Sequence, residues 1–284
     1  MSERERWVPL SLTLAGIPFR GVSIAGRETW FHVPSLDLAF DVGRSPAEVV
    51  PAPNLFLSHS HLDHAGGLAY WASQRRLLRL PSARVFTDPV TVPAWRQILA
   101  LHAGLEGVEY HVSIEPLGPG DSVELRKDLS VSAFRADHRV PTVGFVASEV
   151  RHRLVPGWQG RPQEEIRSAI QSGEEVTKRS PRPLLAFSGD TGAGIFETAP
   201  REAFEAKVFL LECSFAEEAD LSRARNYGHM HVDDLAEHAD LFANEALVLT
   251  HLTLRGTPAE LRRTISRRLP ASLASRTVLF LPPE

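Results

Sequence analysis

Short apolar runs of β type alternate with segments of helical spacing along most of this 284-residue chain. Such alternation is typical of α/β and α+β folds, in which helices cover buried sheets. No repeat of fixed period occurs, which argues against a solenoid or a propeller. We therefore predict an α/β (α+β) architecture, built as a single domain over residues 1–284.

The predicted elements follow from this alternation. The strands are expected at Leu36–Val42, Asn54–Ser58, Arg84–Thr87, Gly107–Ile114, Ser130–Arg135, Val143–Ser148, Leu184–Ser188, Val208–Leu211, Leu247–Thr250 and Thr277–Leu281. The helices are expected at Ala65–Arg76, Pro93–Ala103, Glu164–Gln171, Val232–Ala243 and Pro258–Leu269.

One stretch, Glu149–Pro183, lacks the apolar alternation and is rich in proline, glycine, glutamine and charge. It carries seven arginine or lysine residues and five glutamates, a net charge of about +2 by side-chain count. Connections of this length in a compact domain are usually functional or disordered. We predict an arm-like insertion with one short helix.

Composition excludes several classes of protein. Apolar residues make up 43% of the chain and charged residues 23%, which are ordinary globular values. The formal charge of −4 gives no global reason to expect a nucleic-acid or membrane partner. The charged start and the lack of a long apolar run predict no signal peptide and no membrane span. The single Cys213 excludes an intramolecular disulfide and a thiolate-rich metal site, and it suits a reducing cytoplasm.

Polar residues able to bind metal follow several of the predicted strands. Ser58-His59, Ser188-Gly189-Asp190 and Thr250-His251 each come directly after an apolar run. Side chains at the carboxyl ends of neighbouring strands meet at one edge of a sheet, where open α/β folds place their sites. We therefore expect these three segments to converge.

The strongest signal is the loop Ser58–Gly67, which holds four potential metal ligands in six residues: His59, His61, Asp63 and His64. In extended backbone His59 and His61 point the same way, so both can reach one ion. Asp63 and His64 follow the turn into a helix and can face a second ion. Imidazole and carboxylate donors without thiolate favour zinc, with manganese or iron as alternatives.

Two ions need further ligands from distant segments. His138 follows a predicted strand and can complete the first site, and His251 can complete the second. Asp190 is a strand-end carboxylate whose two oxygens can bridge both ions.

These residues, in this order, resemble the metallo-β-lactamase superfamily, and within it the chain from about Gly16 to Leu269 is similar to ribonuclease Z, especially its short bacterial and plant forms. Besides the histidine loop, the resemblance is carried by Gly21–Gly26, Phe40–Arg44, His138 with Gly144-Phe145, Phe187–Thr191, Glu212–Phe215, Gly228–His231 and Leu249–Arg255.

The resemblance implies a four-layer αβ/βα sandwich and two zinc ions. His59, His61 and His138 would hold one ion, Asp63, His64 and His251 the other, with Asp190 between them. It also implies hydrolysis of a phosphodiester, namely removal of the 3′ trailer of a tRNA precursor to leave a 3′ hydroxyl, by a homodimer.

Catalytic roles are implied by the same resemblance. Asp63 is the general-base candidate, and His229 would stabilise the phosphoryl transition state or protonate the leaving oxygen. Glu212 is expected to orient His229, and Asp41 a ligand histidine. His231 and His238 are expected at the surface.

The chain departs from the ribonuclease Z pattern in two places. Its arm is short, with one lysine and Val155–Trp158 in place of a Gly-Pro tip, and Leu252, Thr253 and Gly256 stand where an aromatic residue, serine and tyrosine are common. Two alternatives therefore stay open: a small-substrate hydrolase on the same scaffold, such as a cyclic-nucleotide phosphodiesterase or a thioesterase, and a metal-binding protein without catalysis. A basic surface from the site to the arm would favour RNA, and an enclosed apolar pocket a small molecule.

Overall fold

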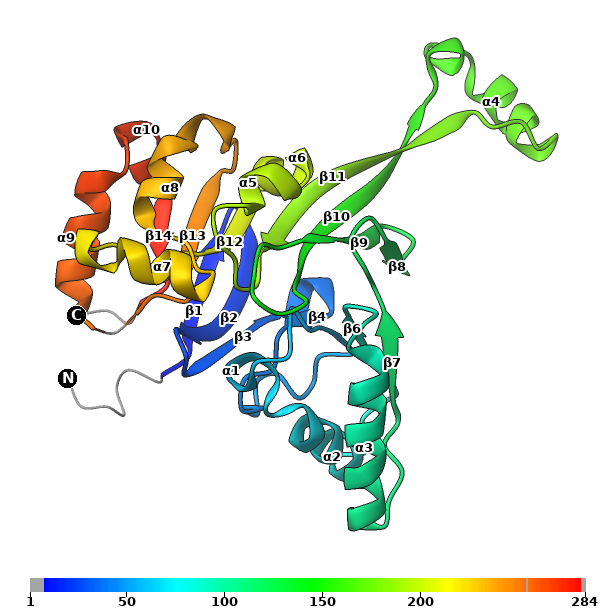
Figure 1. Ribbon diagram of the computed structural model, residues 1–284. Coiled ribbons are helices and arrows are strands. Elements are labelled where there is room, and N and C mark those ends of the chain that lie inside the picture. Colours follow the sequence, from blue (N-terminus) through cyan, green and yellow to red (C-terminus); the bar gives the residue numbers. More distant parts are fainter. Residues whose placement is uncertain (1–7, 254, 282–284) are drawn as a thin grey trace.

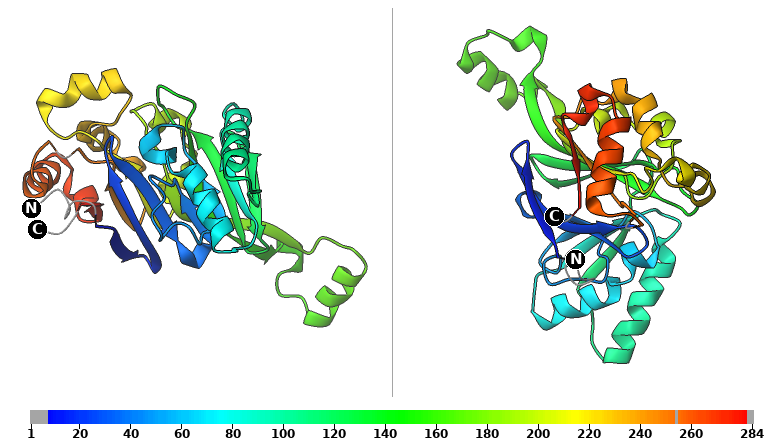
Figure 2. Two further views of the ribbon diagram at one scale, coloured as in Figure 1. Left: turned by 90° about the horizontal axis from the view of Figure 1, so that it is seen from below. Right: turned by 90° about the vertical axis from the view of Figure 1, so that its left-hand side faces the viewer.

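The computed structural model describes residues 8–253 and 255–281. Two seven-stranded sheets pack face to face, and helices cover the outer side of each sheet (Figures 1 and 2). This is the predicted α/β four-layer sandwich.

The first sheet contains β1 (Leu10–Leu14), β2 (Ile17–Ile24), β3 (Glu28–Val33), β4 (Leu38–Phe40), β5 (Asn54–Phe56), β6 (Ala83–Thr87) and β7 (Val112–Pro116). The second contains β8 (Ser122–Arg126), β9 (Leu129–Arg135), β10 (Val143–Leu154), β11 (Thr177–Phe187), β12 (Val208–Glu212), β13 (Ala246–Thr250) and β14 (Thr277–Leu279). The α-helices are α1 (Leu62–Ala65), α2 (Leu68–Leu77), α3 (Val92–Glu106), α4 (Gln163–Gln171), α5 (Ile195–Thr198), α6 (Arg201–Glu205), α7 (Leu221–Tyr227), α8 (Val232–Glu237), α9 (Pro258–Arg268) and α10 (Ala271–Ala274).

The two halves of the chain repeat one pattern of strand pairing. In each sheet the strands lie in chain order, the first three pairings are antiparallel and the last three are parallel. Parallel strands place their carboxyl ends at a common edge. Each half therefore offers one such edge for functional residues.

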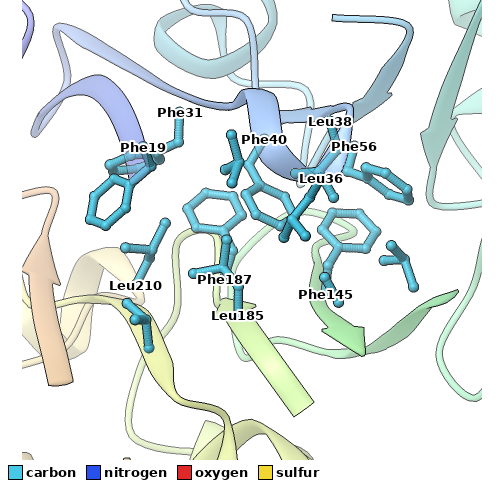
Figure 3. Close-up of a cluster of buried hydrophobic side chains, with 14 of the residues drawn as sticks. Phe19, Phe31, Leu36, Leu38, Phe40, Phe56, Phe145, Leu185, Phe187 and Leu210 are labelled. Carbon is cyan, nitrogen blue, oxygen red and sulfur yellow. The ribbon is translucent and has the colours of Figure 1, made fainter. Parts of the chain in front are cut away.

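Aromatic side chains fill the space between the sheets (Figure 3). The rings of Phe40 and Phe187 lie 5.0 Å apart across this core, and those of Phe56 and Phe86 lie 4.8 Å apart. Separate apolar clusters join α2 and α3 to the first sheet, and α8 and α9 to the second. Burial of both faces explains why the central strands read as continuous apolar runs.

The ten predicted strands all coincide with observed strands, but four observed strands were not predicted: β1, β2, β3 and β8. The strand predicted from Gly107 begins only at Val112, because α3 continues to Glu106 and ends at Gly107 in a left-handed conformation. The helix predicted over Ala65–Arg76 is two helices, α1 and α2, separated by Gly66-Gly67.

Strands β10 and β11 extend beyond the second sheet as a paired ribbon that carries α4 at its tip (Figure 1). The register continues from Phe145↔Phe187 to Leu154↔Thr177. The ribbon and its tip occupy most of the segment 149–183 and project away from the rest of the molecule.

Candidate metal centre

The histidine loop follows β5 and enters α1 at the edge of the first sheet. His59 is buried, with its Nε2 3.0 Å from Nδ1 of the exposed His61. His138, after β9, brings its Nε2 to 3.5 Å from the same Nδ1 of His61. These three imidazoles therefore converge from two sheets on one point.

Asp190, after β11, lies between two groups of donors. Its Oδ2 is 3.7 Å from Nε2 of His59, and its Oδ1 is 3.2 Å from Nε2 of His64. Gly189 makes this approach possible: it has a φ of +62°, and a Cβ atom there would lie 2.7 Å from Cβ of Ser58.

A second group of donors is completed by His251, after β13. Its Nε2 lies 3.6 Å from Oδ2 of Asp63 and 3.4 Å from Oδ2 of Asp190. Nε2 of His64 is 3.7 Å from the same Asp63 oxygen. The structure thus brings all seven predicted ligands together in two adjoining clusters that meet at Asp190.

The far nitrogens of four of these imidazoles have partners that set their orientation. Nδ1 of His64 is 2.6 Å from Oδ2 of Asp41, and Nδ1 of His251 is 2.8 Å from Oγ of Ser214. Nδ1 of His59 similarly meets Oγ of Ser58, and Nδ1 of His138 meets the carbonyl of Gly228. Such partners hold a ring and its tautomer for metal binding.

Buried ligand atoms without hydrogen-bond partners show that the donor set fits a metal ion. Nε2 of His64, Nε2 of His251 and Oδ1 of Asp190 are buried without a hydrogen-bond partner among the described residues. Buried polar atoms are normally satisfied, so three unpaired ligand atoms that face one another fit a bound cation. Burial also lowers the pKa of His59 well below its ordinary value, which keeps that imidazole neutral and able to ligate.

His229 and Glu212 lie beside the clusters. Nδ1 of His229 is 3.3 Å from Oε1 of Glu212, whose other oxygen accepts the backbone N–H groups of Thr191 and Met230. Burial by itself lowers the pKa of His229, but the Glu212 carboxylate outweighs it and raises that pKa to about 9. A donor atom of His229 lies within 4.8 Å of donors of Asp190 and His251.

One expectation near the site is wrong. His231 is buried, not at the surface: its ring caps the start of α8, with Nδ1 accepting from the backbone of Asp233. His238 is half-buried and stacks on Phe196 with ring centroids 4.0 Å apart. Sequence reasoning also gave no role to Ser214, whose position within the quoted Glu212–Phe215 segment was the only signal for it.

The model of the β-lactamase superfamily domain matches residues 33–252. The chain is 32% identical over 268 residues to tRNase Z TRZ1 of Arabidopsis thaliana, covering 94% of this chain and 95% of that relative. It belongs to the tRNase Z family of the β-lactamase superfamily. The resemblance carried by the histidine loop and the strand-end motifs is confirmed.

Solved structures share the fold at lower sequence identity. The metallo-β-lactamase fold protein YhfI from Bacillus subtilis superposes with a TM-score of 0.59 at 13% identity, over 90% of this chain and 92% of that one. The short form of human tRNase Z gives 0.53 at 19% identity, over 86% and 89%. Within the described residues, no helix is long and apolar enough to cross a membrane.

Proposed function

We propose that this chain is a zinc-dependent endoribonuclease of the ribonuclease Z type, which removes the 3′ trailer from tRNA precursors. The chain is a metal-dependent hydrolase by its family. The observation that carries the proposal is the pair of donor clusters sharing Asp190, with His229 beside them. We treat residues 1–284 as a single domain with an arm-like insertion at about 149–183.

The metal proposal is two zinc ions, with manganese or iron as alternatives. His59, His61 and His138 would hold one ion and Asp63, His64 and His251 the other, with Asp190 serving both. Two adjacent divalent ions supply Lewis acidity to a phosphoryl oxygen and lower the pKa of water. The donor types, nitrogen and oxygen without sulfur, are those that zinc accepts at catalytic sites.

The chain's own residues supply proton transfer and orientation. We assign Asp63 as the general base that takes a proton from the attacking water. The water oxygen bonds to phosphorus, the bond from phosphorus to the 3′ oxygen of the tRNA body breaks, and His229 gives that oxygen a proton. Glu212 positions His229 through its contact at Nδ1. The products are a 3′ hydroxyl on the tRNA and a 5′ phosphate on the trailer.

The arm lies far from the donor clusters of its own chain. Strand β11 leads from the arm at Thr177 to the site after Phe187, and eleven residues of strand span about 33 Å. A basic surface from the site to the arm, which would favour RNA, would therefore have to extend over this distance within one chain. We propose a homodimer, in which the arm of one copy contacts RNA bound at the other. Exposed Leu77, Leu101 and Leu105 on α2 and α3 give this proposal an apolar surface.

We also propose a cytoplasmic location, because the single cysteine, Cys213, is buried and free. The assignment of RNA as the substrate follows from family membership. In the described part of the chain, the cleft that opens at Asp63 is lined by Arg27 and Arg44 as well as by Leu62 and Tyr70, so it is not the enclosed apolar pocket that would favour a small molecule.

The test uses the purified protein after metal analysis. A tRNA precursor with a 3′ trailer is incubated with the wild type, with Asp63→Ala and with His102→Ala, which removes an exposed histidine on α3. We expect cleavage to a 3′ hydroxyl by the wild type and by His102→Ala, and none by Asp63→Ala. Hydrolysis of bis(p-nitrophenyl) phosphate by the wild type without cleavage of the precursor would overturn the RNA assignment and leave a small-substrate hydrolase. Full activity of Asp63→Ala would remove Asp63 from the mechanism.

A further inference from the structure

A cleft of about 540 Å³ opens beside Asp63, on the side formed by the first half of the chain. Besides Asp63 it is lined by Arg27, Arg44, Leu62 and Tyr70. The volume lies within the usual range of small-ligand sites. None of these four other residues takes part in the donor clusters, so we consider what they could bind at the mouth of the site.

The walls of the cleft are tied to the donor clusters by hydrogen bonds. The turn between β2 and β3, which carries Arg27, is held because Ala25 donates its backbone N–H to the carbonyl of Leu252 at 3.3 Å. Ser23 Oγ accepts the backbone N–H of His251 at 2.8 Å. On the other wall Gly67 donates to the carbonyl of Gly43 at 2.7 Å. The cleft is therefore a preformed extension of the site.

The lining offers apolar and cationic groups to the solvent. Leu62, directly before Asp63, is 76% exposed, and Tyr70 is 56% exposed. Nε and Nη2 of Arg44 both bond to Oε2 of Glu28, so its charge is compensated. Arg27 is exposed, and no carboxylate among the described residues pairs with it. An exposed ring and an uncompensated guanidinium in one cleft form the combination that binds a single-stranded nucleotide, by stacking on the base and by charge on the phosphate.

The geometry of in-line displacement indicates which nucleotide of the substrate lies in the cleft. This step rests on the proposed function. The attacking water and the departing 3′ oxygen lie on opposite sides of phosphorus, so the general base and the leaving group do too. The cleft adjoins Asp63, the assigned base, and the 3′ oxygen belongs to the tRNA body. The cleft is therefore on the side away from the departing body and is free for the trailer, which stays bonded to phosphorus through its 5′ oxygen.

We propose that this cleft binds the first nucleotide of the trailer: its base stacks on Tyr70, and Arg27 contacts the phosphate that follows it. Leu62 contributes an apolar wall. The cleft thus selects substrates with an unpaired nucleotide directly after the cleavage point.

The test compares three precursors with two-nucleotide trailers: an unmodified one, one whose first trailer nucleotide is abasic, and one whose linkage after that nucleotide is a neutral methylphosphonate. For the wild type, loss of the base is expected to lower kcat/KM about 5- to 160-fold, the range that stacking of one base supports. Tyr70→Ala should cleave the unmodified and abasic precursors at similar rates, whereas Tyr70→Phe should keep the preference. Arg27→Ala should lose the preference for the charged linkage, and Arg27→Lys should retain most of it.

Arg76→Ala serves as the matched control, because Arg76 is exposed near the end of α2, outside the cleft. It should behave like the wild type with all three precursors. A Tyr70→Ala protein that still discriminates as the wild type does would overturn the proposal. A wild type with equal kcat/KM for the unmodified and abasic precursors would also overturn the proposal. A Tyr70→Ala protein that keeps its discrimination but becomes smaller by light scattering would overturn it too, and would assign Tyr70 to an interface between copies. No cleavage of any precursor by the wild type would instead overturn the proposed function.

Discussion

Asp41 offers a sharp test of how the second donor cluster is held. It is fully buried and accepts hydrogen bonds from the backbone N–H of Ser58 at 2.7 Å and from Oγ of Ser58 at 2.8 Å. Its Oδ2 also lies 2.6 Å from Nδ1 of His64. Metal binding requires the neutral form of His64, and in that form the contact places the proton on Nδ1 and leaves the lone pair on Nε2, which faces Asp190.

The variant Asp41→Asn keeps the shape of the side chain and removes this preference. Asparagine tolerates the left-handed backbone of residue 41, which has a φ of 52°. If its oxygen still accepts from Ser58, its amide N–H₂ faces Nδ1 of His64. That nitrogen must then accept, and the proton moves to Nε2, where it blocks metal binding. Loss of such an orienting partner typically costs 10- to 100-fold in metal affinity, or about 1.4–2.7 kcal/mol.

The assay is zinc affinity, measured by competition with a chromophoric chelator, together with metal content after dialysis. Asp88→Asn is the matched control. Asp88 is equally buried, and its carboxylate accepts the backbone N–H of Val90 at 2.9 Å, but it lies outside the donor clusters. We expect at least tenfold weaker binding for Asp41→Asn and unchanged binding for Asp88→Asn. Zinc affinity of Asp41→Asn within threefold of the wild type would refute the tautomer argument.

Three further predictions concern catalysis, stability and RNA binding. His229→Ala should lower kcat on the tRNA precursor by about 10²- to 10⁴-fold, the usual contribution of a general acid, with metal content unchanged by elemental analysis; loss of metal would make His229 a ligand instead. Gly189→Ala should lower the free energy of unfolding, measured with denaturant, by about 1–3 kcal/mol more than Gly16→Ala does. Both glycines have positive φ, but only a Cβ at Gly189 would meet Ser58, at 2.7 Å. Equal losses in the two variants would contradict this. The logarithm of kcat/KM for the precursor should fall with the logarithm of salt concentration, and Arg153→Ala, in the arm, should make the slope shallower by about 1, whereas an unchanged slope would separate that arginine from RNA.

The donor residues were predictable because their signal is local. Each follows a buried strand, and an apolar run that ends in histidine or aspartate places that side chain at a sheet edge. The loop from His59 to His64 needs only the period of two of extended backbone and one helical turn. Its position could therefore be predicted without knowing how the two sheets pack.

The missed strands differ in the local signal they carry. β1 is Leu-Ser-Leu-Thr-Leu, a clean apolar alternation whose leucines are only half-buried, whereas β3 buries Glu28 together with Trp30 and shows no such alternation. Glu28 is buried because it pairs with Arg44, a contact 16 residues away in sequence. The break between α1 and α2 also has a tertiary cause: a Cβ at Gly67 would lie 2.4 Å from the backbone nitrogen of Ser45. The burial of His231 depends likewise on distant residues, since its Nε2 meets the carbonyl of Glu217.

The repeated topology explains why the site lies where it does. In each half the fourth strand ends in a phenylalanine of the central core and is followed by a buried aspartate: β4 by Asp41 and β11, after a Ser-Gly turn, by Asp190. The two phenylalanines, Phe40 and Phe187, contact each other across the sheets, so the two strand ends are brought to the same place by core packing. The equivalent aspartates then take different tasks, since Asp190 faces the donors of both clusters and Asp41 supports His64 from behind. Each cluster also draws donors from both halves, the first half supplying the histidine loop and the second supplying residues 138, 190 and 251. Neither half can therefore assemble both donor clusters alone, and the same aromatic packing that joins the sheets is what brings the proposed metal ligands together.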